Sequence, residues 1–248
     1  MSESTIKISL DTDIGSDIDD AICLAYLLSQ PRCNLLGITT VSGQAPKRAE
    51  LASVLCRLAD NKVPIYPGIE SPLLTRQKQP EAAQFEAMGQ WSRQTDFPRS
   101  EAIWFLKNTI RRHPGEIVLL AIGPLTNIAL LFSIDPEIPS LLKGLVMMCG
   151  AFTAEQLAAK PLEWNAICDP YATAIVYSHS VRVHQSIGLD VTRRVTLEAD
   201  EVKRRFRAPI LRPVLDFAEV WFRKSNRITF HDPLAAVTLF DRDVCRLE

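Results

Sequence analysis

The chain has 248 residues, of which 47% are hydrophobic and 23% charged, a balance typical of a globular protein large enough to bury its own core. Its formal net charge of -1 argues against a nucleic acid or an anionic membrane as a partner and favours a small-molecule ligand. The six cysteines form no CxxC pair, and no apolar run reaches the ~18 residues of a membrane-spanning helix, so we expect free thiols in a cytoplasmic protein.

The first predicted element is a short buried strand over residues 6–10, and a turn at Gly15 and Ser16 separates it from a helix over residues 21–28. Five carboxylates crowd around that turn: Asp11, Asp13, Asp17, Asp19 and Asp20. Crowded acids repel one another and raise one another's pKa, and a hard divalent cation such as Ca²⁺ or Mg²⁺ relieves this repulsion. We therefore favour a metal site over the simpler alternative, in which two of the acids only cap the helix.

The next elements continue the alternation of strand and helix. We predict a strand over residues 33–41, a helix over 47–60 and a strand over 63–66. Residues 69–99 then lose all periodicity and carry scattered aromatic residues. Long irregular segments in globular domains are usually functional, so we expect this one to cover the site, partly as a short helix.

The second half of the chain repeats the pattern. The predicted elements are a helix over 101–112, a strand over 116–122, a helix from Thr126 to 132, a strand over 145–149, a helix over 170–178, a strand over 181–189 and mostly helix over 197–218. Because strand and helix alternate, we expect an α/β fold: a single-domain, mostly parallel twisted sheet flanked by helices and Rossmann-like, spanning residues 1–248. Thr126 should then lie at the same sheet edge as Asp13.

Seven short motifs carry a resemblance to a known family. They are DTDIG (11–15) with DDA (19–21), ITTVSG (38–43), VPIYPG (63–68), GPLTNIA (123–129), EWN (163–165) with DP (169–170), GLDVT (188–192) and HDP (231–233). In this order they resemble the nucleoside hydrolase family, the inosine-uridine-preferring nucleoside N-ribohydrolases, over nearly the whole chain. The resemblance implies the nucleoside hydrolase fold and Ca²⁺-dependent hydrolysis of a ribonucleoside to ribose and free base, with a role in purine or pyrimidine salvage.

The resemblance also implies a metal site at matching positions. Its ligands would be Asp13, Asp20, the main-chain carbonyl of Thr126, and Asp232. In this family the calcium ion orients the water that attacks the anomeric carbon of ribose, and Asp13 would accept the proton of that water as the general base. Oxygen ligands suit Ca²⁺, so the chemistry of these residues agrees with the implied role.

A sugar and base site follows from the same comparison. Its residues would be Asp19, Gln44, Glu163 and Asn165 around the ribose, Trp164 against the base, and His231 as the acid that protonates the departing base. Considered alone, His231 is equally compatible with orienting a metal ligand. Trp221 is a second candidate to stack on the base, but for this residue we favour core packing. Relatives are commonly dimers or tetramers, which implies a homo-oligomer.

Four departures from the family pattern bear on these assignments. Two additional residues precede the Asp19-Asp20 pair, so Asp17 is an alternative to either acid, and Gln44 and Leu157 stand where the family has asparagine. The longer side chain of Gln44 would move its amide by about one C–C bond, and catalysis is sensitive to a misplacement of ~1 Å. The chain also ends soon after the HDP motif, whereas relatives usually continue further, so we expect a C-terminus shortened relative to the family.

Two alternatives therefore stay open. The first is a catalytically impaired relative that binds nucleoside or sugar ligands. The second takes Asp11 and Asp13 as the DxD of a haloacid-dehalogenase-like phosphatase, with Asp11 attacking phosphate beside Mg²⁺. The sequence does not choose between purine and pyrimidine, because the choice depends on loop residues within 69–99 and 193–230.

Overall fold

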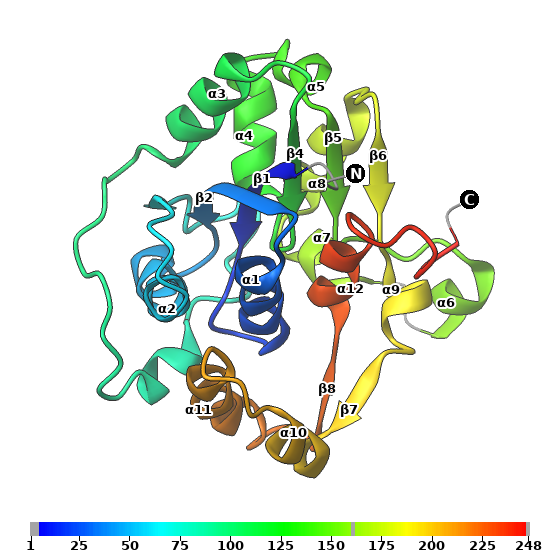
Figure 1. The fold of residues 1–248 in the computed structure, drawn as a ribbon. Coiled ribbons are helices and arrows are strands. Elements are labelled where there is room, and N and C mark those ends of the chain that lie inside the picture. The colour runs from blue at the N-terminus through cyan, green and yellow to red at the C-terminus, as the bar shows by residue number, and fades with distance from the viewer. Residues whose placement is uncertain (1–4, 160–161, 247–248) are drawn as a thin grey trace.

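One parallel sheet of six strands forms the centre of the molecule, with the strand order β3-β2-β1-β4-β5-β6 (Figure 1). The structure is a computed structural model that describes residues 5–159 and 162–246. The strands are β1 (Ile6–Thr12), β2 (Cys33–Thr40), β3 (Ile65–Pro67), β4 (Ile117–Ala121), β5 (Gly144–Met147) and β6 (His184–Ser186). Since the chain runs outward from β1 to β3 and then returns to β4, a topological switch point lies between β1 and β4. The predicted α/β fold with a parallel sheet is confirmed.

The residues of the central strands alternate between two apolar cores, one on each face of the sheet. In β4, Val118 and Leu120 belong to the first core, whereas Leu119 and Ala121 belong to the second. Successive side chains of a strand point to opposite faces, so a strand that is covered on both faces is apolar at every position. All five residues of β4 are accordingly buried.

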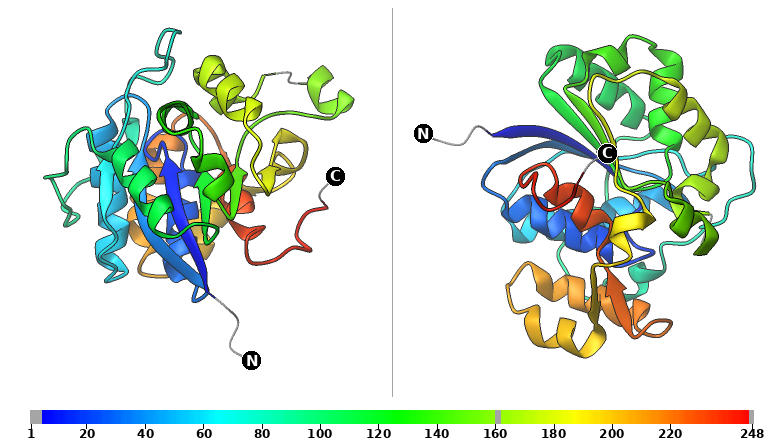
Figure 2. Two further views of the ribbon diagram at one scale, coloured as in Figure 1. Left: turned by 90° about the horizontal axis from the view of Figure 1, so that it is seen from above. Right: turned by 90° about the vertical axis from the view of Figure 1, so that its right-hand side faces the viewer.

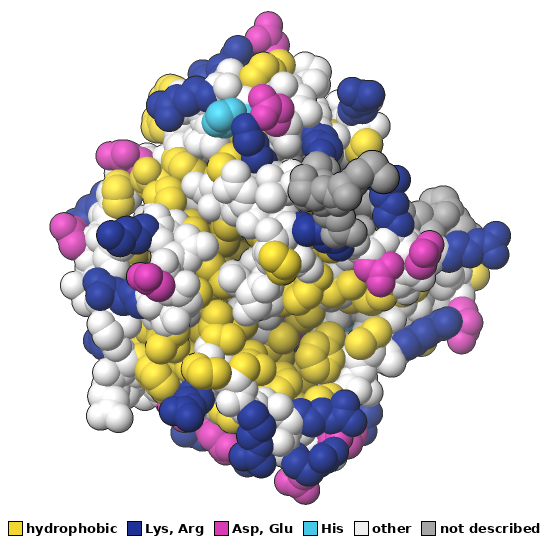
Figure 3. Space-filling model, in the orientation of Figure 1, with side chains coloured by type: hydrophobic (Ala, Val, Ile, Leu, Met, Phe, Trp, Pro, Cys, Tyr) yellow, Lys and Arg dark blue, Asp and Glu magenta, His cyan; other side chains and the backbone are white. Residues whose placement is uncertain are grey.

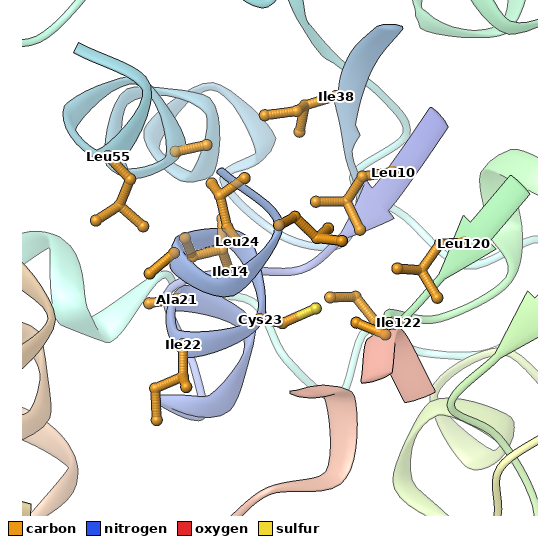
Figure 4. Packing of buried hydrophobic residues seen from close by; sticks show 14 of the residues in the cluster. Leu10, Ile14, Ala21, Ile22, Cys23, Leu24, Ile38, Leu55, Leu120 and Ile122 are labelled. Carbon is orange, nitrogen blue, oxygen red and sulfur yellow. The ribbon is translucent and has the colours of Figure 1, made fainter. Parts of the chain in front are cut away.

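Helices cover both faces of the sheet (Figure 2). The first core is covered by α1 (Asp19–Ser29), α2 (Ala45–Leu58), α11 (Leu211–Trp221) and α12 (His231–Val237), and the second by α3 (Ala102–Arg112), α4 (Thr126–Ile134), α5 (Ile138–Leu141) and α8 (Pro170–Ser178). Strand residues such as Leu10 and Leu120 extend toward α1 in the close view of the first core (Figure 4). Within the described ranges, no helix combines the length and the apolar composition needed to cross a lipid bilayer.

The first core continues to the molecular surface on one side. Figure 3 shows hydrophobic side chains gathered over α1 and toward α11, with Lys and Arg side chains around them. Helix α1 itself is largely buried, and its apolar residues are spread around the whole helix rather than along one stripe. It is packed between α2, α11, α12 and the sheet.

Two predictions about the second half were wrong. The expected strand over 181–189 is only β6, because this edge strand pairs with three residues of β5 and Leu189 already begins α9 (Leu189–Thr192). The expected helix from residue 197 begins later, because Thr196–Glu198 form β7, which pairs antiparallel with β8 (Arg227–Thr229) before α10 (Ala199–Arg205) starts. Periodicity does not reveal a pairing between strands so far apart in the chain.

The segment 69–99 contains one short 3-10 helix, η1 (Ala83–Ala87), and is otherwise irregular. It is nevertheless attached to the body of the protein. The indole nitrogen of Trp91 donates to Asp216 of α11 at 2.8 Å, and Arg93 pairs with Glu50 of α2 at 2.7 Å. The predicted combination of a long excursion and a short helix is confirmed.

Candidate active site

A cavity of about 500 Å³ opens at the carboxyl ends of β1, β4 and β5. This is the edge of an open α/β sheet where ligands bind, because the loops and helix N-termini converge there. Its lining combines a group of acidic residues with apolar, aromatic and other polar residues. The acidic residues are Asp13, Asp17, Asp19, Asp20, Glu81, Glu163 and Asp232, and the others include Gln79, Ile122, Met148, Trp164, Leu189, Trp221, Lys224 and His231.

Three acids from opposite ends of the chain meet in this cavity. Asp19 and Asp20 lie in the first turn of α1, and Asp232 lies in the first turn of α12. Each offers a carboxylate oxygen, and these oxygens lie within 4.8 Å of one another. The main-chain nitrogen of Asp232 also donates to Asp19 Oδ2 at 3.0 Å, which joins the two helix starts. Because helix N-termini favour negative charge, both helices stabilise the cluster.

Burial raises the pKa of Asp19, Asp20 and Asp232 well above the ordinary range, and repulsion between neighbouring carboxylates raises it further. The pKa of Asp17 rises to about 7, mainly through burial. These acids are therefore costly to ionise together unless a cation is bound. A compact set of buried carboxylate oxygens fits Ca²⁺ or Mg²⁺, whereas nitrogen- or sulfur-seeking metals would need other ligands.

Asp13 lines the cavity and contacts the segment 69–99. Its Oδ2 accepts a hydrogen bond from Gln79 Nε2. Its Oδ1 lies so near Gly123 that a Cβ at that position would stand 2.7 Å away. Burial raises the pKa of Asp13, whereas the charge of Arg48 and the bond from Gln79 lower it. The turn at Gly123 therefore leaves room for this carboxylate.

Arg48 was not predicted as part of the site. It belongs to α2 and is fully buried beneath the loop that follows β1. Its guanidinium donates to the main-chain oxygens of Asp13, Ile14, Gly43 and Glu81 and to Ser16 Oγ. A signal was present, since Arg48 stands three residues before Leu51 and so shares the apolar face of its helix.

Thr126 lies at the expected sheet edge but is not brought to the acid cluster. Its hydroxyl donates to Asp169 Oδ2 at 2.8 Å, and it lines a separate small hollow rather than the main cavity. Ile122 lines the main cavity instead, and its carbonyl accepts from Asn165 Nδ2 at 2.9 Å. Of these two residues, Ile122 is the one that lines the cavity together with the acids.

The EWN motif forms the start of α7 (Trp164–Cys168). Glu163 caps this helix, accepting from the main-chain nitrogens of Asn165 at 2.7 Å and Ala166 at 2.8 Å. Asn165 is held by the carbonyls of Ile122 and of Met148, the latter at 3.1 Å. All three residues of the motif line the cavity.

The two asparagine replacements lie outside the cavity. Gln44 adopts a left-handed conformation, with φ of 61°, and its side-chain oxygen accepts from Ala82 N at 3.1 Å. Leu157 is 43% exposed on α6 (Ala154–Ala159). The structure thus does not bring Gln44 to the expected sugar site. The cavity is lined instead by the side-chain amide of Gln79. The sequence predicted only that the segment 69–99, which contains Gln79, covers the site.

Three further residues line the cavity: His231, Trp221 and Lys224. His231 Nδ1 shares a hydrogen bond with Thr192 Oγ1 at 2.7 Å, and the indole of Trp221 donates to the carbonyl of Arg227 at 2.9 Å. Trp221, which sequence reasoning assigned to packing, contacts both the core and the cavity. Lys224 was not predicted, because an exposed lysine in a loop carries no sequence signal.

Asp11 takes no part in the cavity. It is buried in β1, where Oδ1 accepts from Asn127 Nδ2 at 2.7 Å and from Thr39 Oγ1 at 2.8 Å. Burial raises its pKa to about 7. A carboxyl group enclosed in this way is not placed to attack a phosphate, which removes the observation behind the phosphatase alternative.

Comparisons with known proteins agree with this geometry. The family model described as "Inosine-uridine preferring nucleoside hydrolase" matches residues 8–248. An uncharacterized protein of Schizosaccharomyces pombe is 33% identical over 207 residues, covering 80% of this chain and 66% of the relative. "Probable uridine nucleosidase 2" of Oryza sativa is 30% identical over 269 residues, covering 98% of this chain and 78% of the relative. The solved "Inosine-Guanosine Nucleoside Hydrolase" is 24% identical and has a similar fold, with a TM-score of 0.80 over 96% of this chain and 79% of its own.

Proposed function

The chain belongs to the family of inosine-uridine preferring nucleoside hydrolases, and from this premise we propose that it hydrolyses the N-glycosidic bond of a ribonucleoside to ribose and free base. The observation that carries the proposal is the cavity itself. It brings the acids Asp13, Asp19, Asp20 and Asp232 and the aromatic side chains of Trp164 and Trp221 to one cavity. A sugar that develops positive charge suits the acids, and a flat base suits the aromatic side chains.

We propose that the acid cluster holds Ca²⁺. The ligands would be Asp20 and Asp232, whose carboxylate oxygens lie within 4.8 Å of each other, and Asp13, which lines the same cavity. A main-chain carbonyl would complete the set, and Ile122 is better placed for that contact than Thr126 because it lines the cavity. Bound Ca²⁺ would supply positive charge that lowers the pKa of a coordinated water and holds it toward the sugar. Asp19 also contributes a carboxylate oxygen to the group with Asp20 and Asp232. It is therefore a candidate either to bind the ion or to accept a hydrogen bond from a ribose hydroxyl.

The proton of the attacking water would pass to Asp13. This carboxylate lies at the cavity wall, and the hydrogen bond from Gln79 Nε2 holds one of its oxygens. A carboxylate held in one orientation is an effective proton acceptor because it need not reorganise during the reaction. Glu163 and Asn165 would contact the ribose, and the negative charge of Glu163 would favour an oxocarbenium-like transition state.

His231 would give a proton to the departing base. Thr192 holds its Nδ1 at 2.7 Å, which leaves the ring in a defined orientation at the cavity wall. Trp164 and Trp221 would stack on the base. We infer no preference between purine and pyrimidine bases.

A panel of purine and pyrimidine ribonucleosides, assayed for free ribose with and without a chelator, tests this function. We expect turnover of at least one substrate, loss of turnover with chelator and its return with added Ca²⁺. Absence of turnover for the whole panel with Ca²⁺ present would contradict the proposal. Isothermal titration calorimetry on the same panel would then show whether the protein binds nucleosides without hydrolysing them, the alternative that Gln44 and Leu157 motivate.

We further propose a cytoplasmic homo-oligomer. All six cysteines are free thiols, which fits a reducing compartment. The oligomeric state is a prediction from the family alone, and light scattering coupled to size-exclusion chromatography measures it directly.

A further inference from the structure

The side chain of Gln79 connects two functional parts of the cavity. Gln79 lies on the segment 69–99 and is 8% exposed. Its Nε2 donates to Asp13 Oδ2, and its Oε1 accepts from the indole nitrogen of Trp164 at 2.7 Å. One amide group therefore touches both the proposed general base and an aromatic residue of the cavity.

The chemistry of the two partners allows only one orientation of this amide. An indole N–H can only donate, so the amide oxygen must face Trp164. An ionised carboxylate can only accept, so the amide nitrogen must face Asp13. The two hydrogen bonds agree on the same orientation, and breaking either one would leave the amide free to rotate.

The main chain of Gln79 is fixed as well. Its nitrogen donates to Gln77 Oε1 at 2.8 Å, and its carbonyl accepts from Ser42 Oγ at 3.3 Å. The segment is thus attached at Gln79 to the loop after β2. A side chain anchored at its backbone and at both ends of its amide holds its partners at a fixed separation.

We propose that Gln79 is a positioning residue that sets the orientation of Asp13 relative to the base-stacking face of Trp164. The inference rests on the proposed function, since it assigns a role within the same reaction. A base stacked on Trp164 would then place the anomeric carbon at a set distance from the proton acceptor. Such alignment matters because a misplacement of about 1 Å can cost roughly 100-fold in rate.

Gln79→Leu and Trp164→Phe separate the two halves of this connection. Gln79→Leu removes both hydrogen bonds, whereas Trp164→Phe keeps an aromatic ring and removes only the N–H. We expect Gln79→Leu to lower kcat by about 10- to 100-fold with a much smaller change in KM. In the double variant the loss in kcat should be smaller than the product of the two single-variant losses, because the indole N–H acts on Asp13 only through Gln79.

Gln94→Leu is the matched control. Gln94 lies on the same segment, is exposed, and donates to the carbonyl of Asp96 at 2.5 Å rather than to any group of the cavity. This variant should keep the kcat of the unmodified protein. The proposal would be overturned if the kcat of Gln79→Leu lies within about twofold of that of the control. It would also be overturned if the free-energy losses of the two single variants simply add in the double variant.

A spectroscopic measurement tests the connection without turnover. The chain has four tryptophans, so its ¹H–¹⁵N spectrum should contain four indole resonances, and Trp164→Phe identifies that of Trp164. We expect Asp13→Asn to move this resonance in the unmodified background but not in the Gln79→Leu background. If Asp13→Asn leaves it unmoved in both, Gln79 does not connect the two residues. If the unmodified protein is inactive but its Trp164 resonance moves on Asp13→Asn, only the proposed function is refuted and the connection through Gln79 remains.

Discussion

Asp13 has a close neighbour at each of its two carboxylate oxygens. Gln79 bonds Oδ2, while Gly123 leaves just enough space beside Oδ1. Burial raises the pKa of Asp19, Asp20 and Asp232, and repulsion between neighbouring carboxylates raises it further. The orientation of Asp13 is defined before any ligand binds, which suits a proton acceptor.

Asp13→Asn should nearly abolish hydrolysis. The amide has almost the shape of the carboxylate but cannot take a proton, and general base catalysis contributes about 10²- to 10⁴-fold. We expect kcat to fall by at least about 10³-fold, since a proposed metal ligand is altered as well. Steady-state kinetics with saturating Ca²⁺ measures this. Retention of more than about a tenth of the activity would mean that another group accepts the proton.

Gly123→Ala should impair catalysis through Asp13. The new Cβ would stand 2.7 Å from Asp13 Oδ1 and 2.8 Å from a side-chain carbon of Val41, so the carboxylate must shift. We expect a loss of about 10- to 100-fold in kcat. Gly144→Ala is the control, because a Cβ there meets only Val183 at 3.4 Å, an ordinary contact. Equal kcat for the two variants would show that Gly123 has no effect on Asp13.

At the scale of secondary-structure elements, α2 holds the loop after β1 through a single side chain. Arg48 donates to main-chain oxygens from three separate loops and to Ser16. A buried cation paired with carbonyls and near Asp13 gains little for stability by itself. Its removal, however, leaves several buried acceptors without a donor.

Arg48→Met should therefore destabilise the protein by about 3–5 kcal/mol, the range found for buried charged groups that lose a partner. Urea unfolding followed by circular dichroism measures this. Arg93→Met is the comparison, because the Arg93–Glu50 pair is partly exposed and such pairs contribute about 0–1 kcal/mol. Similar losses for the two variants would show that the buried network adds nothing.

These elements also show what could be predicted from the sequence. The β1 strand, the acids after it and the HDP motif are local patterns, and they predicted both the sheet edge and three of the acids that meet there. The pairing of β7 with β8, the reach of Arg48 beneath the β1 loop and the contact of Gln79 with Asp13 depend on where distant segments pack. Periodicity within a segment contains no information about such contacts.

The whole molecule brings its first and last helices together at the acid cluster. Helices α1 and α12 pack side by side, and their first turns carry Asp19, Asp20 and Asp232. A bound ion would join them. The stability of the protein should therefore depend on both metal and pH.

The metal-free protein should become less stable as pH rises from about 4 to 7. Carboxyls such as Asp17, whose pKa rises from 3.8 to about 7 on folding, bind protons in the folded state over this range and release them when the protein unfolds. The unfolded state then binds fewer protons, so stability falls with increasing pH. Differential scanning fluorimetry in chelator, at constant ionic strength, measures the change in Tm.

Saturating Ca²⁺ should reverse this trend. At about 100 times its Kd the ion would add about 2.7 kcal/mol, or roughly 5–10 °C in Tm, and the gain should increase with pH as the ligands ionise. Asp20→Asn, which removes one repelling charge and one ligand, should weaken both effects. A Tm that does not respond to Ca²⁺ at pH 8 would contradict the metal site.

The hydrogen bond between Asp232 and Asp19 spans 213 residues of chain. During synthesis on a ribosome α1 emerges early, but Asp232, which completes the acid cluster, follows 213 residues after Asp19. The proposed ion site would therefore form only after α12 has been made. Any interruption upstream of α12 would yield a chain in which most strands of the central sheet can pair but the proposed ion site lacks Asp232.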